Sequence, residues 1–171
     1  MVFPPRGVPK MGEGLKTEAR MNPIATECAI FGEKASFHHV GLAVESIQEV
    51  NRSCEIFVEK TQRVSIAFIL LNGVRIELLE PLGDNSPISR SLRNGTKLLH
   101  LCYEVPDLEA ALELCKEAGF HRLWRPLPAP LYDNRRVAWV YSKHYGLFEL
   151  LERDRVPAAD RTQAEGPAVN S

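Results

Sequence analysis

The sequence lacks any long hydrophobic run. No apolar stretch in its 171 residues approaches the roughly 20 needed to cross a bilayer. The opening segment, residues 1–14, also lacks the apolar core behind basic residues that is typical of a secretory signal. We therefore expect a soluble, cytoplasmic protein with no membrane partner.

An excess of charge of either sign is missing as well. The chain has 21 Lys and Arg against 22 Asp and Glu, which gives a formal net charge of −1. The basic residues are spread along the chain and form no stripe that could neutralise a phosphate backbone. Nucleic acid is therefore excluded as an expected partner.

Paired cysteines are a third absence. The four cysteines show no CxxC motif and no regular spacing: Cys28, Cys54, Cys102 and Cys115. Disulfide frameworks are typical of short secreted chains, so we expect these residues to be reduced, mostly buried thiols.

The composition, 44% hydrophobic and 25% charged, is sufficient for one substantial core. Residues 1–34 show no sustained period, and we interpret them as a flexible leader that ends in a short ordered piece near residues 25–33. Residues 156–171 are polar and small, which indicates a disordered tail. We expect a single folded domain over residues 35–155.

An internal repeat divides this domain into two modules. The stretch "HVGLAVESI" (39–47) aligns with "HLCYEVPDL" (100–108), and "IELLE" (76–80) aligns with "FELLE" (148–152). Two anchors in the same order indicate a duplicated supersecondary unit. The modules span about residues 35–82 and 97–155.

Each module contains the same series of expected elements. An extended run is followed by a helical segment and then by a hairpin, which turns near Asn72-Gly73 in one module and near residues 144–146 in the other. In the second module a helix begins after Asp107, with apolar residues at helical spacing, and ends near Gly119. The first module has room only for a short helix. The sequence predicts an α+β fold of two tandem β-α-β-β-β modules.

Two adjacent histidines begin the first extended run. Strand alternation places His39 on a face with Gly41 and Ala43, and places His38 on the opposite face. The small residues beside His39 leave room for a cavity. The repeat pairs His39 with His100, whereas His38 has no histidine counterpart.

A glutamate lies between apolar neighbours in the last strand of each module. Burying Glu77 or Glu149 is costly unless something neutralises the carboxylate. A pseudo-twofold duplication brings both carboxylates and the two paired histidines toward one axis. Such a mixed N/O set is suited to one divalent ion, such as Zn, Ni, Co, Mn or Fe, held by His39, Glu77, His100 and Glu149.

Residues 36–153 resemble the vicinal oxygen chelate superfamily, which includes glyoxalase I, methylmalonyl-CoA epimerase, extradiol dioxygenases and drug-binding resistance proteins. The stretches "HHVGLAV", "ELLEPLGDNSPISRSL" and "LLHLCYEVPDLEAAL" are most similar to the epimerases. The resemblance implies a curved mixed sheet around a metal site and a homodimer. It implies that His39, His100 and Glu149 are ligands and that Glu77 is the fourth, a position that is Gln in some epimerases and Glu in glyoxalase I.

The same resemblance implies the chemistry. The metal would polarise a carbonyl, in the leading case that of a 2-substituted acyl thioester, so that the adjacent carbon loses a proton. Glu149 is the expected general base, with Glu77 beside it in the catalytic set. Some epimerases carry another catalytic carboxylate on the strand that here contains residues 64–67, and Glu59 is the nearest replacement.

Three further residues are expected to bind substrate. Ser86 lies in the run most specific to the epimerases, Arg136 could meet a phosphate or carboxylate, and Lys143 could contact CoA. Three alternatives stay open: a glyoxalase-like lyase, a non-heme iron dioxygenase, and a non-catalytic small-molecule binding or resistance protein.

Overall fold

The computed structural model describes residues 29–154. The expected leader up to residue 28 and the expected tail, 156–171, lie outside the described residues. Just after the start of the described chain, Ile30 and Phe31 pack against the larger hydrophobic core. This contact agrees with the short ordered piece expected there.

The elements follow the order that the repeat predicts. The first module contains β1 (Ser36–Ala43), α1 (Ile47–Val50), β2 (Phe57–Glu59), β3 (Val64–Leu71) and β4 (Val74–Pro81). A short helix, α2 (Ser89–Arg93), leads to the second module. That module contains β5 (Leu98–Val105), α3 (Leu108–Glu117), β6 (His121–Arg122), β7 (Leu127–Ala129), the 3₁₀ turn η1 (Pro130–Tyr132), β8 (Arg135–Ser142) and β9 (Gly146–Glu152).

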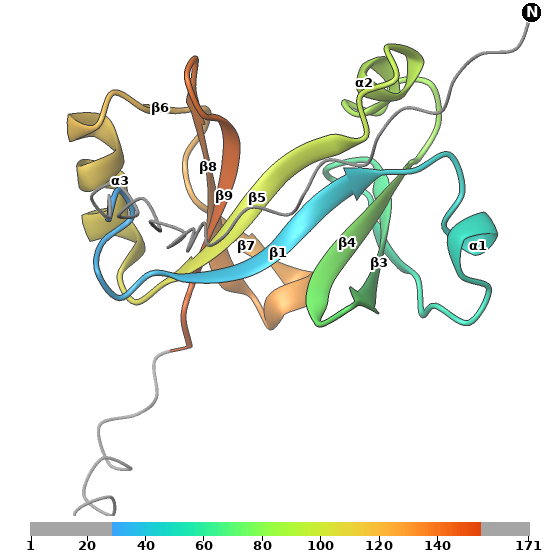
Figure 1. Ribbon diagram of the computed structural model, residues 1–171, viewed down its shortest axis with the longest axis horizontal. Helices are drawn as coiled ribbons and strands as arrows, with labels where there is room; N and C mark the ends of the chain where they lie inside the picture. The colour runs from blue at the N-terminus through green and yellow to red at the C-terminus, as the bar shows by residue number, and fades with distance from the viewer. Residues whose placement is uncertain (1–28, 155–171) are drawn as a thin grey trace, which may run out of the picture.

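The strands form one mixed, curved sheet of nine strands (Figure 1). Its order is β2-β3-β4-β1-β5-β9-β8-β6, and β7 also pairs with β8. In each module the first strand runs parallel to the last, since β1 pairs with β4 and β5 pairs with β9. The two modules join where β1 and β5 pair antiparallel. The α+β prediction is confirmed, with β7 and α2 as additional elements.

Local sequence chemistry explains the turns and the main helix. Asn72 and Gly73 both have positive φ, 49° and 85°, as a two-residue hairpin turn of type I′ requires. The Asp107 side chain accepts a hydrogen bond from the Ala110 N–H and so caps α3. Gly119 follows α3 with a φ of 79°, as expected for a left-handed helix end.

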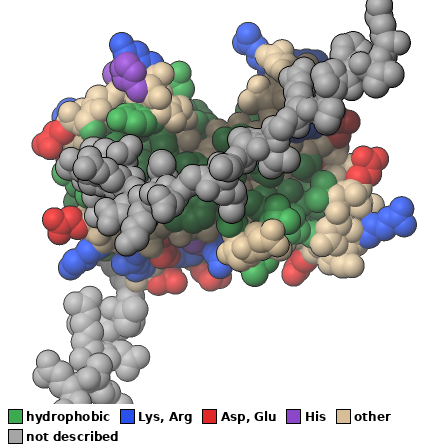
Figure 2. Space-filling view, viewed as in Figure 1, with side chains coloured by type: hydrophobic (Ala, Val, Ile, Leu, Met, Phe, Trp, Pro, Cys, Tyr) green, Lys and Arg blue, Asp and Glu red, His purple; other side chains and the backbone are tan. Residues whose placement is uncertain are grey.

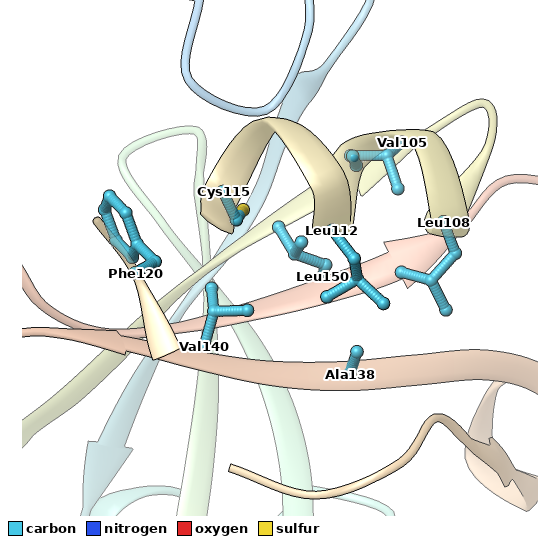
Figure 3. Close-up of a cluster of buried hydrophobic side chains, with 9 residues drawn as sticks. Val105, Leu108, Leu112, Cys115, Phe120, Ala138, Val140 and Leu150 are labelled. Carbon is cyan, nitrogen blue, oxygen red and sulfur yellow. The ribbon is translucent and has the colours of Figure 1, made fainter. Parts of the chain in front are cut away.

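The two helices that carry core residues lie near opposite ends of the sheet (Figure 1). On α3, Leu108, Leu112 and Cys115 pack against Val140 and Leu150 of the strands below (Figure 3). Burying each leucine contributes about 1.5–3 kcal/mol, so the apolar stripe of α3 holds it in place.

The first module has a smaller core. Ile47, from the single turn of α1, packs with Ile76 and Leu78 of β4. These two residues flank Glu77 in the strand, just as Phe148 and Leu150 of the α3 core flank Glu149. Alternation therefore directs both glutamates to the sheet face opposite the helices.

Within residues 29–154, Cys54, Cys102 and Cys115 are free thiols, and the last two are buried. This confirms the expectation for the three cysteines that lie in the described chain. No helix in that range is long and apolar enough to span a membrane.

Candidate metal centre

Four neighbouring strands bring His39, Glu77, His100 and Glu149 together on the inner face of the sheet. They lie on β1, β4, β5 and β9, and the pairing places Gly41 of β1 beside both Glu77 and His100. All four side chains are buried, with exposed fractions between 0 and 4%. We call these four residues the quartet.

Gly41 determines where His100 can lie. A Cβ atom at position 41 would overlap the imidazole ring of His100. The ring therefore lies directly over the β1 backbone. The small residues beside His39 were expected to leave an open cavity, but at Gly41 the space is filled by His100 itself.

The donor atoms of the quartet converge on one point. The two histidine Nε2 atoms are 3.1 Å apart. Glu77 Oε2 lies 3.3 Å from each of them, and Glu149 Oε2 lies 3.3 Å from His39 Nε2 and 3.6 Å from His100 Nε2.

This arrangement fits a divalent metal ion. Donor atoms that share an ion about 2.1 Å away lie roughly 3.0–3.4 Å from one another, close to the spacing of the quartet. Glu149 Oε2 is buried and has no aligned hydrogen-bond donor among the described residues. Neutral imidazoles and carboxylates together are ligands for Zn, Ni, Co, Mn or Fe.

Without a metal, the charged forms of His39 and Glu77 are stabilised by their neighbours in the quartet. Burial alone would lower the pKa of His39, but Glu149 and Glu77 outweigh it and raise the pKa to about 9. Burial alone would raise the pKa of Glu77, but His100 and His39 outweigh it and lower the pKa to about 2. A cation that binds here replaces a proton.

An aromatic ring packs against each histidine of the quartet. Phe68 lies edge-on to His39 with ring centroids 5.6 Å apart, and Trp139 lies edge-on to His100 at 4.7 Å. Phe68 is directly opposite Glu77 across one hairpin, and Trp139 is directly opposite Glu149 across the other. The sequence analysis missed both, although pairing residues across each predicted hairpin would have found them.

Tyr132 closes the other side of the quartet. Its ring is stacked over that of His39, and its hydroxyl donates to Glu77 Oε1 over 3.5 Å, at the long limit of a hydrogen bond. Burial and the neighbouring carboxylates raise the Tyr132 pKa, so the hydroxyl stays protonated. Tyr132 ends a proline-rich segment, residues 125–132, and the 3₁₀ turn at the end of this segment places it at the site.

The alternation argument is wrong for His38. The pairing of β1 with β5 shifts register between Phe37 and His39, so His38 is the extra residue of a β-bulge. Its Nδ1 atom lies 2.9 Å from His39 Nδ1, and its ring packs against Tyr132. The two imidazoles are therefore neighbours instead of lying on opposite faces.

His38, His39 and Cys102 form a second close group of potential ligands. Burial and the charge of Glu149 raise the pKa of the Cys102 thiol well above its usual value. A thiol must lose its proton to bind a metal, so this group is the weaker candidate.

A cavity of about 470 Å³ opens beside the quartet. His100 and Trp139 are among its lining residues, and Leu99, Ile88 and Leu147 contribute apolar walls. Its walls come from both the α2 side and the β8–β9 hairpin. The outline of the molecule has a notch between the side that carries α3 and the side that carries α2 (Figure 2). The cavity is suited to a ligand with an apolar portion next to the quartet.

A small hollow of about 20 Å³ shares part of its lining with this cavity. Glu59, Glu77 and Glu149 all line it, and Gln62 and Trp139 line both spaces. It can hold about one water or one small substrate group. The structure therefore brings Glu59 to the same space as the two glutamates of the quartet.

None of the three residues expected to bind substrate lines the cavity or the hollow. Ser86 is buried with no hydrogen-bond partner for its hydroxyl in the described chain, and it directly precedes two cavity residues, Pro87 and Ile88. Lys143 is exposed in the β8–β9 turn. Arg136 is not at the quartet. It lies three residues before Trp139 in β8, so its side chain is on the opposite face of the sheet. There its guanidinium donates to Glu152 and Glu109 on the α3 side.

The sequence model of the Glyoxalase/Bleomycin resistance protein/Dioxygenase superfamily matches residues 38–139. The chain is 44% identical over 89 residues to an ethylmalonyl-CoA/methylmalonyl-CoA epimerase of Cereibacter sphaeroides. That match spans 51% of this chain and 66% of the relative, slightly less than two thirds of its length.

Two solved structures share the fold. A hypothetical protein of Bacillus halodurans C-125 is 27% identical, with a TM-score of 0.60 over 71% of this chain and 96% of that one. The methylmalonyl-CoA epimerase of Mycobacterium tuberculosis is 21% identical, with a TM-score of 0.58 over 72% of this chain and 91% of that one.

Proposed function

Because the chain belongs to the glyoxalase/bleomycin resistance protein/dioxygenase superfamily, we propose that it is a metal-dependent epimerase of 2-substituted acyl thioesters. The observation that carries this proposal is the buried quartet beside an apolar cavity. The relative from Cereibacter sphaeroides, an ethylmalonyl-CoA/methylmalonyl-CoA epimerase, supports the substrate class.

The quartet would hold one divalent ion through His39 Nε2, His100 Nε2 and one oxygen each of Glu77 and Glu149. When bound, such an ion supplies Lewis-acid polarisation of a substrate carbonyl and so acidifies the neighbouring C–H bond. Tyr132 contacts the second oxygen of Glu77 over 3.5 Å, which helps to orient this carboxylate.

Glu149 is the better candidate for the general base. Its Oε2 atom lies 3.3 Å from His39 Nε2 and has no aligned hydrogen-bond donor among the described residues, and Glu149 lines the hollow where a substrate carbon could lie. A carboxylate here can take the proton from one face of that carbon.

Epimerisation also requires a proton to be returned to the opposite face. Glu59 lines the same hollow from β2, whereas Glu149 enters it from β9. One oxygen of Glu59 accepts a hydrogen bond of 2.8 Å from the Thr61 N–H, which orients the side chain. We assign Glu59 as the second acid–base group.

The test is hydrogen exchange at C2 of racemic methylmalonyl-CoA in D₂O, followed by mass spectrometry. The protein loaded with Co or Ni is expected to incorporate one deuterium and to interconvert the two epimers. Glu149→Gln and Glu59→Gln should each lose interconversion, and each should retain exchange of only one epimer if its partner still works.

Glu55→Gln is the matched control, because Glu55 is an exposed carboxylate just before β2 and lines none of the cavities described above. It should exchange like the wild type. Metal-loaded wild-type protein that binds the ion but exchanges no C2 proton would overturn the epimerase proposal.

A glyoxalase-like lyase is the second candidate, and one observation favours it. The quartet has two carboxylates and two imidazoles, so a divalent ion leaves it with no net charge to attract a substrate carboxylate. An uncharged thiol adduct of a 2-oxoaldehyde suits such a site. Turnover of that adduct, with no exchange on methylmalonyl-CoA, would favour the lyase.

A further inference from the structure

Trp139 borders three spaces around the quartet. Its side chain lines the apolar cavity of about 470 Å³, the hollow of about 20 Å³, and a third cavity of about 270 Å³ that Glu59 also lines. Of these three spaces, His100 lines the first, whereas Glu77 and Glu149 line the hollow. The indole is therefore a shared wall between the space at the imidazole and the space at the two carboxylates.

This wall is held in place by the quartet itself. Trp139 is half-buried in β8, directly opposite Glu149 across the hairpin, and its ring is edge-on to His100 at 4.7 Å. Gln62 also lines all three spaces, but it is exposed in the turn between β2 and β3 and can change rotamer. The indole is the rigid part of the wall, because it cannot move without disturbing two residues of the quartet.

The proposed reaction indicates which part of the substrate lies at the hollow. Glu149 and Glu59, the two acid–base groups assigned above, both line it, so C2 of the substrate has to lie there. The thioester continues into a long thiol carrier, which needs the largest of the three spaces. The 2-substituent stays beside C2 in the hollow, which holds about one water-sized group.

We propose that Trp139 is a specificity-determining residue, which limits the 2-substituent of the substrate to about the size of a methyl group. A longer chain would have to displace the indole from its contact with His100. One methylene more or less in such a pocket changes the discrimination by about 10- to 200-fold. The inference rests on the epimerase function proposed above and narrows its substrate class.

Competition between racemic methylmalonyl-CoA and racemic propylmalonyl-CoA in D₂O tests this limit. Both substrates are mixed in one reaction with protein loaded with Co or Ni. Mass spectrometry follows the deuterium at C2 of each, and the rate without protein is subtracted. The ratio of the two rates then gives the ratio of their kcat/KM values. The wild type should prefer the methyl substrate by at least about 100-fold, since the propyl group adds two methylenes.

Trp139→Phe and Trp139→Leu make the wall smaller and should each reduce this preference by at least about tenfold. Trp124→Phe is the matched control, because Trp124 lines the two larger cavities but not the hollow. It should keep the wild-type ratio, whatever it does to the two rates. Zn²⁺ affinity is a readout that needs no turnover. In Trp139→Phe it should stay within about threefold of the wild type, because a phenyl ring can keep the edge-on contact with His100.

The inference is overturned if the wild type does not prefer the methyl substrate, if either Trp139 variant keeps the full preference, or if Trp124→Phe loses it as well. Trp139 variants that exchange neither substrate would show that this residue serves the reaction or the fold, and would also overturn it. In each of these cases the wild type still exchanges C2 protons, so the epimerase proposal stands. A metal-loaded wild type that exchanges neither substrate would overturn that proposal, and this inference with it.

Discussion

Gly41 illustrates how a residue without a side chain can control the site. The ring of His100 occupies the volume where any other residue would place its Cβ atom. Phe68 and Trp139 hold the two histidines from the other side, each by an edge-on ring contact. The quartet is therefore fixed by its neighbours before any ion arrives.

Gly41→Ala should displace His100 and weaken metal binding by at least about 100-fold, the upper end for lost contacts around a ligand. The φ of Gly41 is not in the left-handed region, so the backbone itself tolerates alanine. Leu42→Ala, half-buried in the core beside α1, is the control: it should lower the free energy of unfolding and leave metal affinity unchanged. Wild-type affinity in Gly41→Ala would contradict this role.

The His39 pKa predicts a pH dependence for the metal-free protein. Its folded value of about 9 exceeds the ordinary 6.5, so the stabilisation is fully present below pH 6.5 and is lost as the pH rises through 9. Urea denaturation in the presence of a chelator should show the free energy of unfolding falling across this window. Zn²⁺-loaded protein should lack this alkaline loss, and a flat metal-free profile from pH 6.5 to 9 would refute the assignment.

His38 contributes the opposite slope in acid. Burial, together with the charges of His39 and Arg75, lowers its pKa to about 4. Between pH 6.5 and 4 the unfolded chain therefore takes up a proton that the folded chain does not, and stability falls as the pH falls.

Among the elements, those with strong local signals were predictable. The α3 helix has a capping aspartate, an apolar stripe and a terminal glycine, and the β3–β4 hairpin has Asn72-Gly73. The bulge at His38 was not predictable from alternation, because a bulge depends on the register between two strands and β5 is distant in the sequence. Tyr132 was missed because its position depends on how the proline-rich segment packs across the sheet.

Asp107→Ala should lower the free energy of unfolding by about 1 kcal/mol, since it removes the hydrogen bond that caps α3. Ser46→Ala removes the corresponding cap of α1, but that helix has four residues and its cap contact is longer, 3.4 Å, so the loss should be smaller. Neither change should alter metal affinity. Equal losses at both caps, measured by denaturant titration, would contradict this ranking.

On the scale of the whole molecule, the duplication explains why the quartet could be predicted. Each module contributes one histidine and one glutamate, and the antiparallel β1–β5 pair joins the two halves. Equivalent positions therefore meet at the axis. Arg136 has no equivalent arginine in the other module, so its expected contact with substrate was based on its charge alone. In the structure its guanidinium instead contacts Glu152 and Glu109.

Because the ligands come from both modules, a bound ion should stabilise the whole fold. At free metal about 100 times the dissociation constant, the free energy of unfolding should rise by about 2.7 kcal/mol. Denaturant titration with and without Zn²⁺ measures this rise, which should be absent in His100→Ala. An equal rise in that variant would place the bound ion elsewhere.

The most direct test of the account is the metal content of the purified protein, measured by elemental analysis alongside His100→Ala. The account predicts about one divalent transition-metal ion per chain in the wild type, or one taken up from Zn, Ni or Co, and none held at the quartet in the variant. A folded wild-type protein that contains no metal and takes up none would contradict it.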